Sequence, residues 1–414
     1  MPDSWPRPSV PSLPGSGSVP SLFDTTTGRL RPAAPEGDLA RLYVCGITPY
    51  DATHIGHANT YLAFDTLQRV WLDAGLDVRY AQNITDVDDP LLERANATGV
   101  DWRALADSQV ALFRADMAAL RLLPPHDYVA VTEVVDEIAE AVGTLKDRGL
   151  AYAVPTADSA GDDLYFDIAA AERATTWRVG STTRFDHEQL LTLSAEHGGD
   201  PDRAGKHDPL DPLLWRAERA GEPAWDSVVG RGRPGWHIEC SVIALDRLGA
   251  DFTVQGGGAD LAFPHHDLSA GHAAALSGRP LAELYSHAGL IAYQGEKMSK
   301  SLGNLVLVSQ LREQGVPAAG IRLALLAHRY RDEWEWTEQG LDDALARLDA
   351  WRGIRENSAG LRALDVLTAV RERLADDLDT PGALSEIDRA ADAGVDDPDL
   401  VRSLADALLG IDLR

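Results

Sequence analysis

The feature that most restricts the fold is a strand, a helix and a second strand that follow one another early in the chain. Residues 39–45 (LARLYVC) form a short apolar run typical of a buried strand. Residues 59–74 place apolar side chains at a helical spacing, and residues 76–85 (LDVRYAQNIT) alternate as a strand. Two strands joined through a helix normally lie parallel in one sheet, with ligands at the carboxyl ends of the strands. The pattern therefore predicts an α/β fold with a site beside Cys45 and Thr85.

Beyond this unit the pattern changes twice. Helical spacing continues over 101–121 and 132–149, but residues 150–235 are irregular, with many glycines and prolines and short strands such as 162–168. They resemble an insertion between two halves of one sheet, because another strand, 252–255, follows and ends in three glycines. The last part of the chain is helical, with amphipathic stretches near 316–329, 338–352, 361–378 and 383–392.

The composition excludes some classes of protein. The chain has no run of about 18 apolar residues, so no membrane span is expected. The first twenty residues contain six prolines and no apolar stretch, which predicts a mobile arm rather than a signal peptide and, by default, a cytoplasmic location. The net charge of −27 disfavours a broad RNA-binding surface, although a local basic groove is compatible with it.

Two histidines, His54 and His57, stand in THIGHA (53–58), where a helix is expected to begin after the first strand. Backbone N–H groups at a helix start favour an anion, and two imidazoles can donate hydrogen bonds to it. Taken alone, the pair can also be explained by one histidine that caps the helix and one that lies on the surface. Their position at the end of a sheet strand favours an anion site.

Lysine is rare in this chain, and its distribution is informative. Only four of the 38 Lys and Arg residues are lysines, and two of them, Lys297 and Lys300, lie in GEKMSKS (295–301). An ammonium is a compact charge on a flexible stem, suited to a phosphate whose charge moves. With the histidine segment on the other side, these lysines predict a two-sided clamp for a triphosphate. The alternative, a solvated Lys/Ser turn, does not explain why both segments occur together.

HIGH (54–57) and KMSKS (297–301) are the two signatures of class I aminoacyl-tRNA synthetases, which the chain resembles. Further segments resemble the cysteinyl-tRNA synthetase branch over about residues 20–390: YVCGITPYDATHIGHA (43–58), NITDVDD (83–89), GWHIECS (235–241), QGGGADLAFPHHD (255–267) and DLDTPGAL (377–384). The resemblance implies ATP with Mg²⁺, and catalytic roles for His54, His57, Lys297 and Lys300.

The two cysteines, Cys45 and Cys240, gain a role from this resemblance. A disulfide is not expected in a reducing cytosol, and taken alone they are compatible with two isolated buried thiols. The resemblance implies that both, with His265, bind one Zn²⁺. Three protein ligands leave an open position, which the thiolate of free cysteine can fill more strongly than a serine hydroxyl. The synthetases add a glutamate four residues after the histidine; Ser269 stands there in this chain, so three protein ligands are expected.

Four departures argue against tRNA as the acceptor. About 113 residues follow the lysine segment, fewer than an anticodon-reading domain is expected to need. Residues 340–414 contain 17 Asp or Glu, 9 Arg and no Lys. The segment ITPYDATHIGHA differs from the version typical of the synthetases, close to PTVYDYIHIGNA. EHGGDPDR (196–203) and RGRPGWHIEC (231–240) are closer to a sister family, whose motif typically has arginine where this chain has His197.

That sister family comprises the mycothiol-biosynthesis ligases. The resemblance implies that cysteine is activated as cysteinyl-adenylate and passed to the amine of glucosaminyl-inositol, 1D-myo-inositol 2-amino-2-deoxy-α-D-glucopyranoside, with release of AMP and pyrophosphate. A monomer is expected. The resemblance further implies an adenylate site formed by Cys45, Gly46, Ile47, Thr48, Thr60, Asn83, Ile84, Thr85, Trp236, Gly258, Ala259, Asp260 and Ile291.

The resemblance also implies an organisation into domains. In chain order these are an arm (1–35), a Rossmann-like catalytic domain split into 36–135 and 235–295, an inserted subdomain (136–234), the KMSKS loop and stem (296–345), and a C-terminal α-helical domain (346–414).

Several roles and rival functions stay open. The carboxylates of Asp86, Asp88 and Asp89 suit magnesium, but a helix N-terminus with favourable acids is the preferred interpretation. His266 and Asp267 either support the zinc ligands or are structural, and Trp334 and Trp336 are expected in the core. The rival functions are a short cysteinyl-tRNA synthetase and a non-catalytic cysteine sensor. A nucleotide-binding oxidoreductase is discarded, because Gly256, Gly257 and Gly258 lack the GxGxxG spacing.

Overall fold

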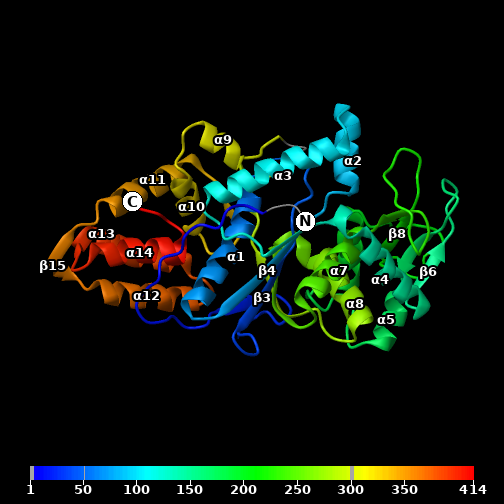
Figure 1. Ribbon diagram of the computed structural model, residues 1–414, viewed down its shortest axis with the longest axis horizontal. Helices are drawn as coiled ribbons and strands as arrows, with labels where there is room; N and C mark the ends of the chain where they lie inside the picture. The colour runs from blue at the N-terminus through cyan, green and yellow to red at the C-terminus, as the bar shows by residue number, and fades with distance from the viewer. Residues whose placement is uncertain (1–3, 51, 299–302) are drawn as a thin grey trace.

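The computed structural model describes residues 4–50, 52–298 and 303–414. A five-stranded sheet of order β11-β10-β3-β4-β5 crosses the middle of the molecule, and all its neighbouring strands pair in parallel. Its strands are β3 (Leu39–Val44), β4 (Asp77–Ile84), β5 (Asp127–Ala130), β10 (Phe252–Gly258) and β11 (Ala282–Ala288). Helix α1 (Ile55–Asp73) joins β3 to β4 (Figure 1). The α/β fold with a parallel sheet is thus confirmed.

Helix α1 begins four residues earlier than the apolar spacing predicts. His54 is its N-cap, with Nδ1 accepting a hydrogen bond of 3.1 Å from the N–H of Gly56. The histidine segment therefore forms the first turn of the helix instead of a loop before it. Ile55 and Ala58 of this first turn are already buried in the core, but the intervening Gly56 and His57 interrupt the apolar spacing.

The strand predicted to end in three glycines is β10, and Gly256, Gly257 and Gly258 form its last three residues. Gly256 pairs with Val44 on β3 and with Ser286 on β11. A Cβ at Gly256 would overlap the ring of Phe64 on α1, and one at Gly257 would crowd the ring of His266. Glycine lets the helix and the turn approach the strand closely, so here it marks tight packing rather than a turn.

Between β5 and helix α7 (Trp236–Leu248) the chain forms a second, antiparallel sheet of order β6-β7-β8-β9. Its strands are β6 (Ala151–Val154), β7 (Asp163–Phe166), β8 (Leu213–Ala217) and β9 (Gly232–Pro234). The accompanying helices are α4 (Val135–Asp147), α5 (Ile168–Ala174) and α6 (His187–Glu196). Figure 1 shows this part at the end of the molecule opposite the last helices. The domain boundaries drawn from the sequence stay a prediction.

The last part of the chain is helical. It comprises α9 (Val308–Glu313), α10 (Ala318–Leu326), α11 (Glu338–Arg352), α12 (Ala363–Ala375), α13 (Thr380–Ala393) and α14 (Pro398–Leu409), with the short strand β15 (Glu356–Leu361). Hydrophobic spacing did not predict α14, which packs on α1. A small sheet pairs β12 (Ile291–Tyr293) with β13 (Glu296–Lys297), both before these helices, and with β14 (Trp334–Glu335), which lies between α10 and α11 in the chain.

A buried ion network joins α1 to the helical part. Asp65 on α1 accepts from Arg69 Nε at 2.8 Å and forms a short ion pair with Arg322 of α10. Arg322 also donates to the carbonyl of Leu409 at 2.5 Å, and Arg69 to that of Asp406 at 2.9 Å, both on α14. Asp65, Arg69 and Arg322 are each at most 1% exposed, so the network locks the catalytic helix to the helical part.

The proline-rich N-terminal segment is packed, so the prediction of a mobile arm is wrong. Trp5 is 4% exposed and donates from Nε1 to the carbonyl of Leu122 at 2.8 Å. Arg371 of α12 donates to the carbonyl of Pro14 at 2.9 Å. Proline has no N–H to satisfy, so an extended proline-rich segment needs only donors for its carbonyls, and arginines supply them. The hairpin of β1 (Ser21–Asp24) and β2 (Arg29–Pro32) follows.

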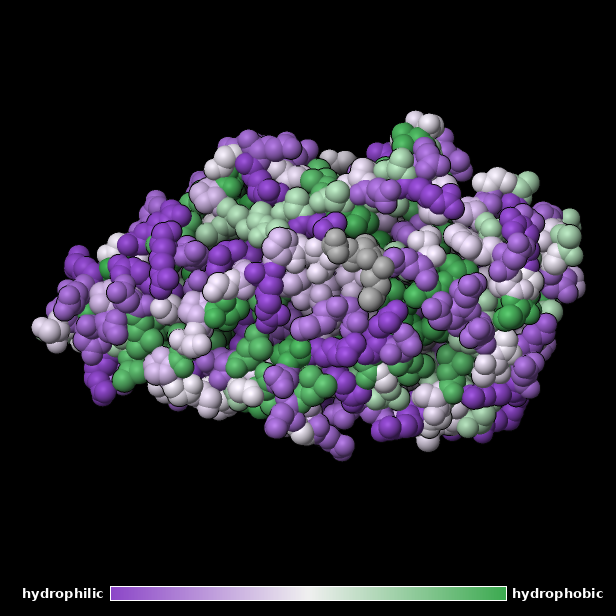
Figure 2. Space-filling model, in the orientation of Figure 1, coloured by the Kyte–Doolittle hydropathy of each residue, from purple (hydrophilic) through white to green (hydrophobic). Residues whose placement is uncertain are grey.

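Among the described residues, none of the helices has the length and apolar character needed to cross a membrane. Hydrophilic residues cover much of the face seen in Figure 2, and the hydrophobic ones are scattered among them. This surface agrees with the net charge of −27.

Candidate active site

A cavity of about 520 Å³ opens where β3, β4 and β10 end. This is the edge at which a parallel sheet presents ligands. Most of the predicted site residues line it: Cys45, Gly46, Ile47, Thr48, His54, His57, Thr60, Asn83, Thr85, Trp236, Cys240, Gly258, Asp260, His265 and Ile291.

Of the predicted residues whose side chains the structure describes, two are not among the lining residues. Ile84 is 2% exposed and belongs to the hydrophobic core, and Ala259 lies in the short turn after β10. The backbone of Lys297 lies in β13, which pairs with β12, and Lys300 lies outside the described residues.

The structure also adds lining residues that the sequence analysis did not assign to the site: Tyr50, Gly56, Tyr61, His197, Leu261, Gly289, Leu290, Met298 and Leu305. Most are apolar or aromatic, and such residues give no local signal that separates a cavity wall from a core. His197 is the exception, because it stands in a motif already noted.

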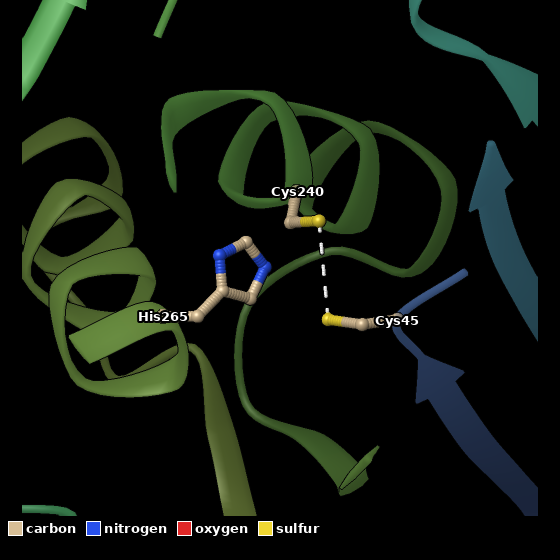
Figure 3. Close-up of side chains that lie close together, drawn as sticks. All are labelled: Cys45, Cys240 and His265. Atoms are coloured by element: carbon tan, nitrogen blue, oxygen red, sulfur yellow. Dashed lines mark hydrogen bonds between the residues drawn. The ribbon is translucent and has the colours of Figure 1, made fainter. Parts of the chain in front are cut away.

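At one end of the cavity Cys45, Cys240 and His265 meet (Figure 3). Cys45 follows β3, Cys240 lies on α7, and His265 lies in the turn Ala262–His266. One potential ligand atom from each lies within 4.8 Å of the others, and all three side chains are buried. The described residues contain no other such group of three His, Cys, Asp or Glu ligands. Residues almost 200 positions apart in sequence are thus brought into one cluster.

The donor set fits a tetrahedral zinc ion. The two Sγ atoms lie 3.8 Å apart, whereas a disulfide requires about 2.05 Å. Two sulfurs bound to one zinc at about 2.3 Å would lie about 3.8 Å apart at the tetrahedral angle. The interpretation of two isolated thiols is therefore wrong.

His265 is oriented as a metal-binding histidine. Its Nδ1 lies 3.1 Å from Nδ1 of His237, and Trp236 stacks on its ring at 4.3 Å between centroids. Figure 3 shows the other ring nitrogen turned toward the two sulfurs. Burial, followed by the neighbouring His237 and His272, lowers the pKa of His265, so the ring is neutral and offers a lone pair.

Further side chains surround the sulfur of Cys45. Nε2 of His266 lies 3.2 Å from it, and Gln255 Nε2 lies 3.5 Å away. His266 in turn contacts His287 at 2.8 Å, and His287 contacts Thr25 Oγ1 at 2.7 Å. Of the two roles considered for His266, support of a ligand is the one that this geometry favours.

Asp267 has a structural role. Its carboxylate accepts from the N–H groups of Gly180 at 2.9 Å and Thr182 at 2.8 Å, and from the Thr182 hydroxyl at 2.9 Å. These bonds tie the inserted segment to the start of α8 (Asp267–Ser277), beside the turn that carries His265.

Between the two ends of the cavity, Asn83 organises the ends of β3 and β4. Its Oδ1 accepts from the N–H of Gly46 at 2.8 Å and from the hydroxyl of Tyr43 at 3.1 Å, and its Nδ2 donates to Thr85 Oγ1 at 3.0 Å. A Cβ at Gly46 would overlap the backbone carbonyl of Asn83. Glycine is therefore required where the two strand ends meet.

The other end of the cavity holds the histidine pair. The rings of His54 and His57 stack at 3.8 Å between centroids, with 27° between their planes. Both side chains are half-buried in the first turn of α1. The N–H groups of Ile55 and Gly56 are already bonded, to the carbonyl of Val306 and to Nδ1 of His54. The partial positive charge of the helix start remains and suits an anion.

The three carboxylates after β4 act as protein anchors. Asp86 accepts from Thr132 Oγ1 at 2.5 Å, Asp88 is the N-cap of α2 (Asp89–Thr98), and Asp89 pairs with Arg233. Burial raises the pKa of Asp88 to about 6. The preferred interpretation, a helix N-terminus with favourable acids, holds for Asp88 and Asp89, whereas Asp86 binds Thr132 instead.

The prediction that Trp334 and Trp336 pack in the core is confirmed. Trp336 is 4% exposed and lies in the main hydrophobic cluster. Trp334 packs against that cluster and stacks on His328 at 3.7 Å. Neither residue is among those that line the cavity.

Comparison with known proteins identifies similar families and folds. The family model of the class I (C) tRNA synthetase catalytic domain matches residues 34–346. An L-cysteine:1D-myo-inositol 2-amino-2-deoxy-alpha-D-glucopyranoside ligase of Clavibacter michiganensis is 62% identical, covering 99% of this chain and 98% of its own. The ligase of the same name from Thermobispora bispora is 58% identical, covering 99% and 100%.

Solved structures support the fold. Mycobacterium tuberculosis methionyl-tRNA synthetase with methionyl-adenylate matches with a TM-score of 0.59 and 16% identity, covering 86% of this chain and 81% of its own. A putative arginyl-tRNA synthetase of Campylobacter jejuni matches with a TM-score of 0.55 and 12% identity, covering 91% and 93%. At these identities the likeness concerns the fold alone.

Proposed function

The chain belongs to the family of L-cysteine:1D-myo-inositol 2-amino-2-deoxy-α-D-glucopyranoside ligases, and from this membership we propose how its residues carry out the reaction. The protein is an ATP-dependent ligase of mycothiol biosynthesis that joins cysteine to the amine of glucosaminyl-inositol. The observation that carries the residue assignment is the cavity with a Cys–Cys–His cluster at one end and a helix start bearing two histidines at the other.

Cysteine is selected at the metal end. Cys45, Cys240 and His265 would hold Zn²⁺ with one position open to the substrate. When bound, the zinc supplies a ligand position that favours a thiolate over the hydroxyl of serine. Trp236 covers His265 and stands beside the bound amino acid.

Activation takes place at the phosphate end. The carboxylate of cysteine attacks the α-phosphorus of Mg-ATP, the bond to the bridging oxygen breaks, and pyrophosphate leaves. His54 and His57 stabilise charge on the α-phosphate together with the positive end of the α1 helix dipole. Lys297 and Lys300 hold the leaving pyrophosphate from the opposite side.

The remaining predicted residues hold the cysteinyl-adenylate. Gly46, Ile47, Thr48 and Thr60 lie along one wall of the cavity, and Asn83 and Thr85 lie at the end of β4. Gly258 and Asp260 face the ribose, and Ile291 on β12 contacts adenine. Ile84 and Ala259 contribute through their backbone. In the second step the neutral amine of the sugar attacks the carbonyl carbon, an amide forms, and AMP leaves.

The charge of the last part of the chain bears on which acceptor the protein uses. Residues 340–414 carry 17 Asp or Glu against 9 Arg and no Lys, which opposes contact with tRNA phosphates. We propose that the protein acts as a cytoplasmic monomer and does not charge tRNA.

Mass spectrometry of products tests the assignment. Wild-type protein with ATP, cysteine and glucosaminyl-inositol should yield the cysteinyl amide and AMP, and with tRNA it should yield no cysteinyl-tRNA. Robust charging of tRNA would support a short synthetase instead. Zinc and cysteine binding without cysteine-dependent ATP–pyrophosphate exchange would support a sensor.

A further inference from the structure

His197 is the single contribution of a large segment of the chain to the cavity. Of the described residues that line it, no other comes from the segment between β5 and α7, residues 131–235. Helix α6, which His197 terminates, packs against the turn Ala262–His266 that carries the ligand His265. His197 therefore forms part of the same wall as Trp236 and His265.

The hydrogen bonding of His197 determines which ring nitrogen can accept. Its Nδ1 lies 2.8 Å from the carbonyl oxygen of Leu193. A carbonyl oxygen only accepts, so Nδ1 carries the proton in the neutral ring and Nε2 carries the lone pair. His197 thus presents a fixed hydrogen-bond acceptor, suited to a hydroxyl or amine N–H of a ligand.

The backbone after His197 is fixed by local geometry. Gly198 has φ +85°, and the N–H of Gly199 donates to the carbonyl of Ser194 at 2.8 Å. A Cβ at Gly199 would overlap Ser194. The glycine pair therefore closes the end of α6 tightly and holds His197 at its C-cap.

The loop beyond the glycine pair is pinned to the antiparallel sheet. Lys206, one of the four lysines of the chain, has a side chain that is 3% exposed and donates to Asp200 Oδ1 at 2.9 Å and to the carbonyl of Pro209 at 2.7 Å. Asp200 also accepts from the hydroxyl of Tyr165 on β7. Arg203 pairs with Asp163 on the same strand at 3.1 Å. A surface loop with so many anchors keeps its shape, as a binding wall requires.

We propose, resting on the function proposed above, that His197 is an acceptor-binding residue whose Nε2 accepts a hydrogen bond from a hydroxyl group of the aminosugar–inositol. The metal ligands account for the binding of cysteine, and the start of α1 accounts for the binding of the triphosphate. The segment 131–235 adds His197 to the cavity wall as a further polar side chain. The polyhydroxylated acceptor is the one substrate that still needs such a group. His197 would set the affinity for the acceptor and leave activation of cysteine untouched.

The test compares three variants by steady-state kinetics. His197→Ala should raise the KM for glucosaminyl-inositol by about 3- to 10-fold, the range for one lost hydrogen bond. Its cysteine-dependent ATP–pyrophosphate exchange should match the wild type. His197→Gln, whose amide oxygen can replace Nε2, should restore most of the KM. His187→Ala is the matched control, since His187 is an exposed histidine at the other end of α6.

An unchanged KM for the acceptor in His197→Ala would overturn the proposal, and so would a raised KM for cysteine in the exchange assay. If the alanine variant did not fold, His197→Phe, which fills the ring volume without a lone pair, would replace it with the same expected result. A wild-type protein that exchanges pyrophosphate but forms no amide would instead contradict the proposed function. The two failures are therefore distinguishable.

Discussion

The two ends of the cavity are built in different ways. At the metal end, Cys45, Cys240 and His265 are each at most 5% exposed and are held by contacts with other side chains. At the phosphate end, His54 and His57 are half-buried in the first turn of one helix. The metal end is thus shaped by packing between distant segments, whereas the phosphate end uses the polarity of a helix start. Changes at the first end should abolish substrate binding, and changes at the second should slow the chemistry.

The largest effect is expected at the metal end. Cys240→Ala should lose zinc, and cysteine-dependent exchange should fall at least about 1,000-fold, beyond the 10–100-fold typical of residues that only support a ligand. Elemental analysis measures the zinc content, and the exchange assay measures the activation of cysteine. Cys240→Ser keeps the side-chain volume but offers zinc a poorer ligand, so it should lose zinc and exchange activity in the same way. A variant that retained zinc and full exchange would refute this end of the comparison.

A change in the shared scaffold should affect stability without affecting the metal. Asp65→Asn removes the charge that Arg69 and Arg322 neutralise, and should cost about 3–5 kcal/mol of unfolding free energy. Denaturant unfolding measures it, and zinc content should stay constant in the folded protein. Asp73→Asn, whose partner Arg371 is more exposed, should cost about 1 kcal/mol. Equal losses in both variants would contradict a special role for the buried network.

The same carboxylate predicts a pH dependence. Burial alone would raise the pKa of Asp65, but Arg322 and Arg69 outweigh it, so the pKa is lowered. Its contribution to stability is present above the unfolded pKa of about 3.9 and is lost as the pH falls toward the folded value. The wild type should therefore lose more stability than Asp65→Asn between about pH 5 and pH 3. If the wild type and Asp65→Asn lost stability equally as the pH fell, Asp65 would not be the group responsible.

At the phosphate end, His57→Ala should slow exchange about 100-fold, for the loss of one preorganised donor worth about 3 kcal/mol. Zinc content and cysteine binding should match the wild type. Loss of zinc from this variant would mean that the two ends are not independent.

The smallest effect is expected from the lysine segment. Lys297→Ala should slow exchange about 10-fold, the lower range for a hydrogen bond to a charged group. Lys206→Ala is the contrasting variant, because its side chain is buried in the antiparallel part of the fold. It should lower stability and leave exchange unchanged. Equal rates for Lys297→Ala and the wild type would remove Lys297 from the clamp.

Much of the central sheet could be predicted from the sequence. The metal cluster could be predicted too, but for a different reason. The strands β3 and β4 and the helix between them follow from hydrophobic spacing over a few turns of chain. The cluster of Cys45, Cys240 and His265 followed from the resemblance, because three rare ligand types stood in matching motifs. Neither inference required knowledge of packing.

Other features could not be predicted because they depend on partners far along the chain. The N-terminal segment was expected to be mobile, yet Trp5 is buried beside Leu122. Gly256 was expected at the end of a strand, but the close approach of the Phe64 ring, which leaves no room for a Cβ there, was not predicted. His197 belonged to a noted motif, but its place in the cavity wall depends on how α6 packs against the turn before α8.

The residue types by themselves determined which chemistry this protein can perform, because thiols, imidazoles and ammonium groups keep their affinities for zinc and phosphate wherever they stand. Folding alone decided which of these groups share one cavity and how far apart they lie. Such distances depend on close packing between segments separated by more than 200 residues, as Cys45 and His266 are, and no local pattern of residues encodes that packing.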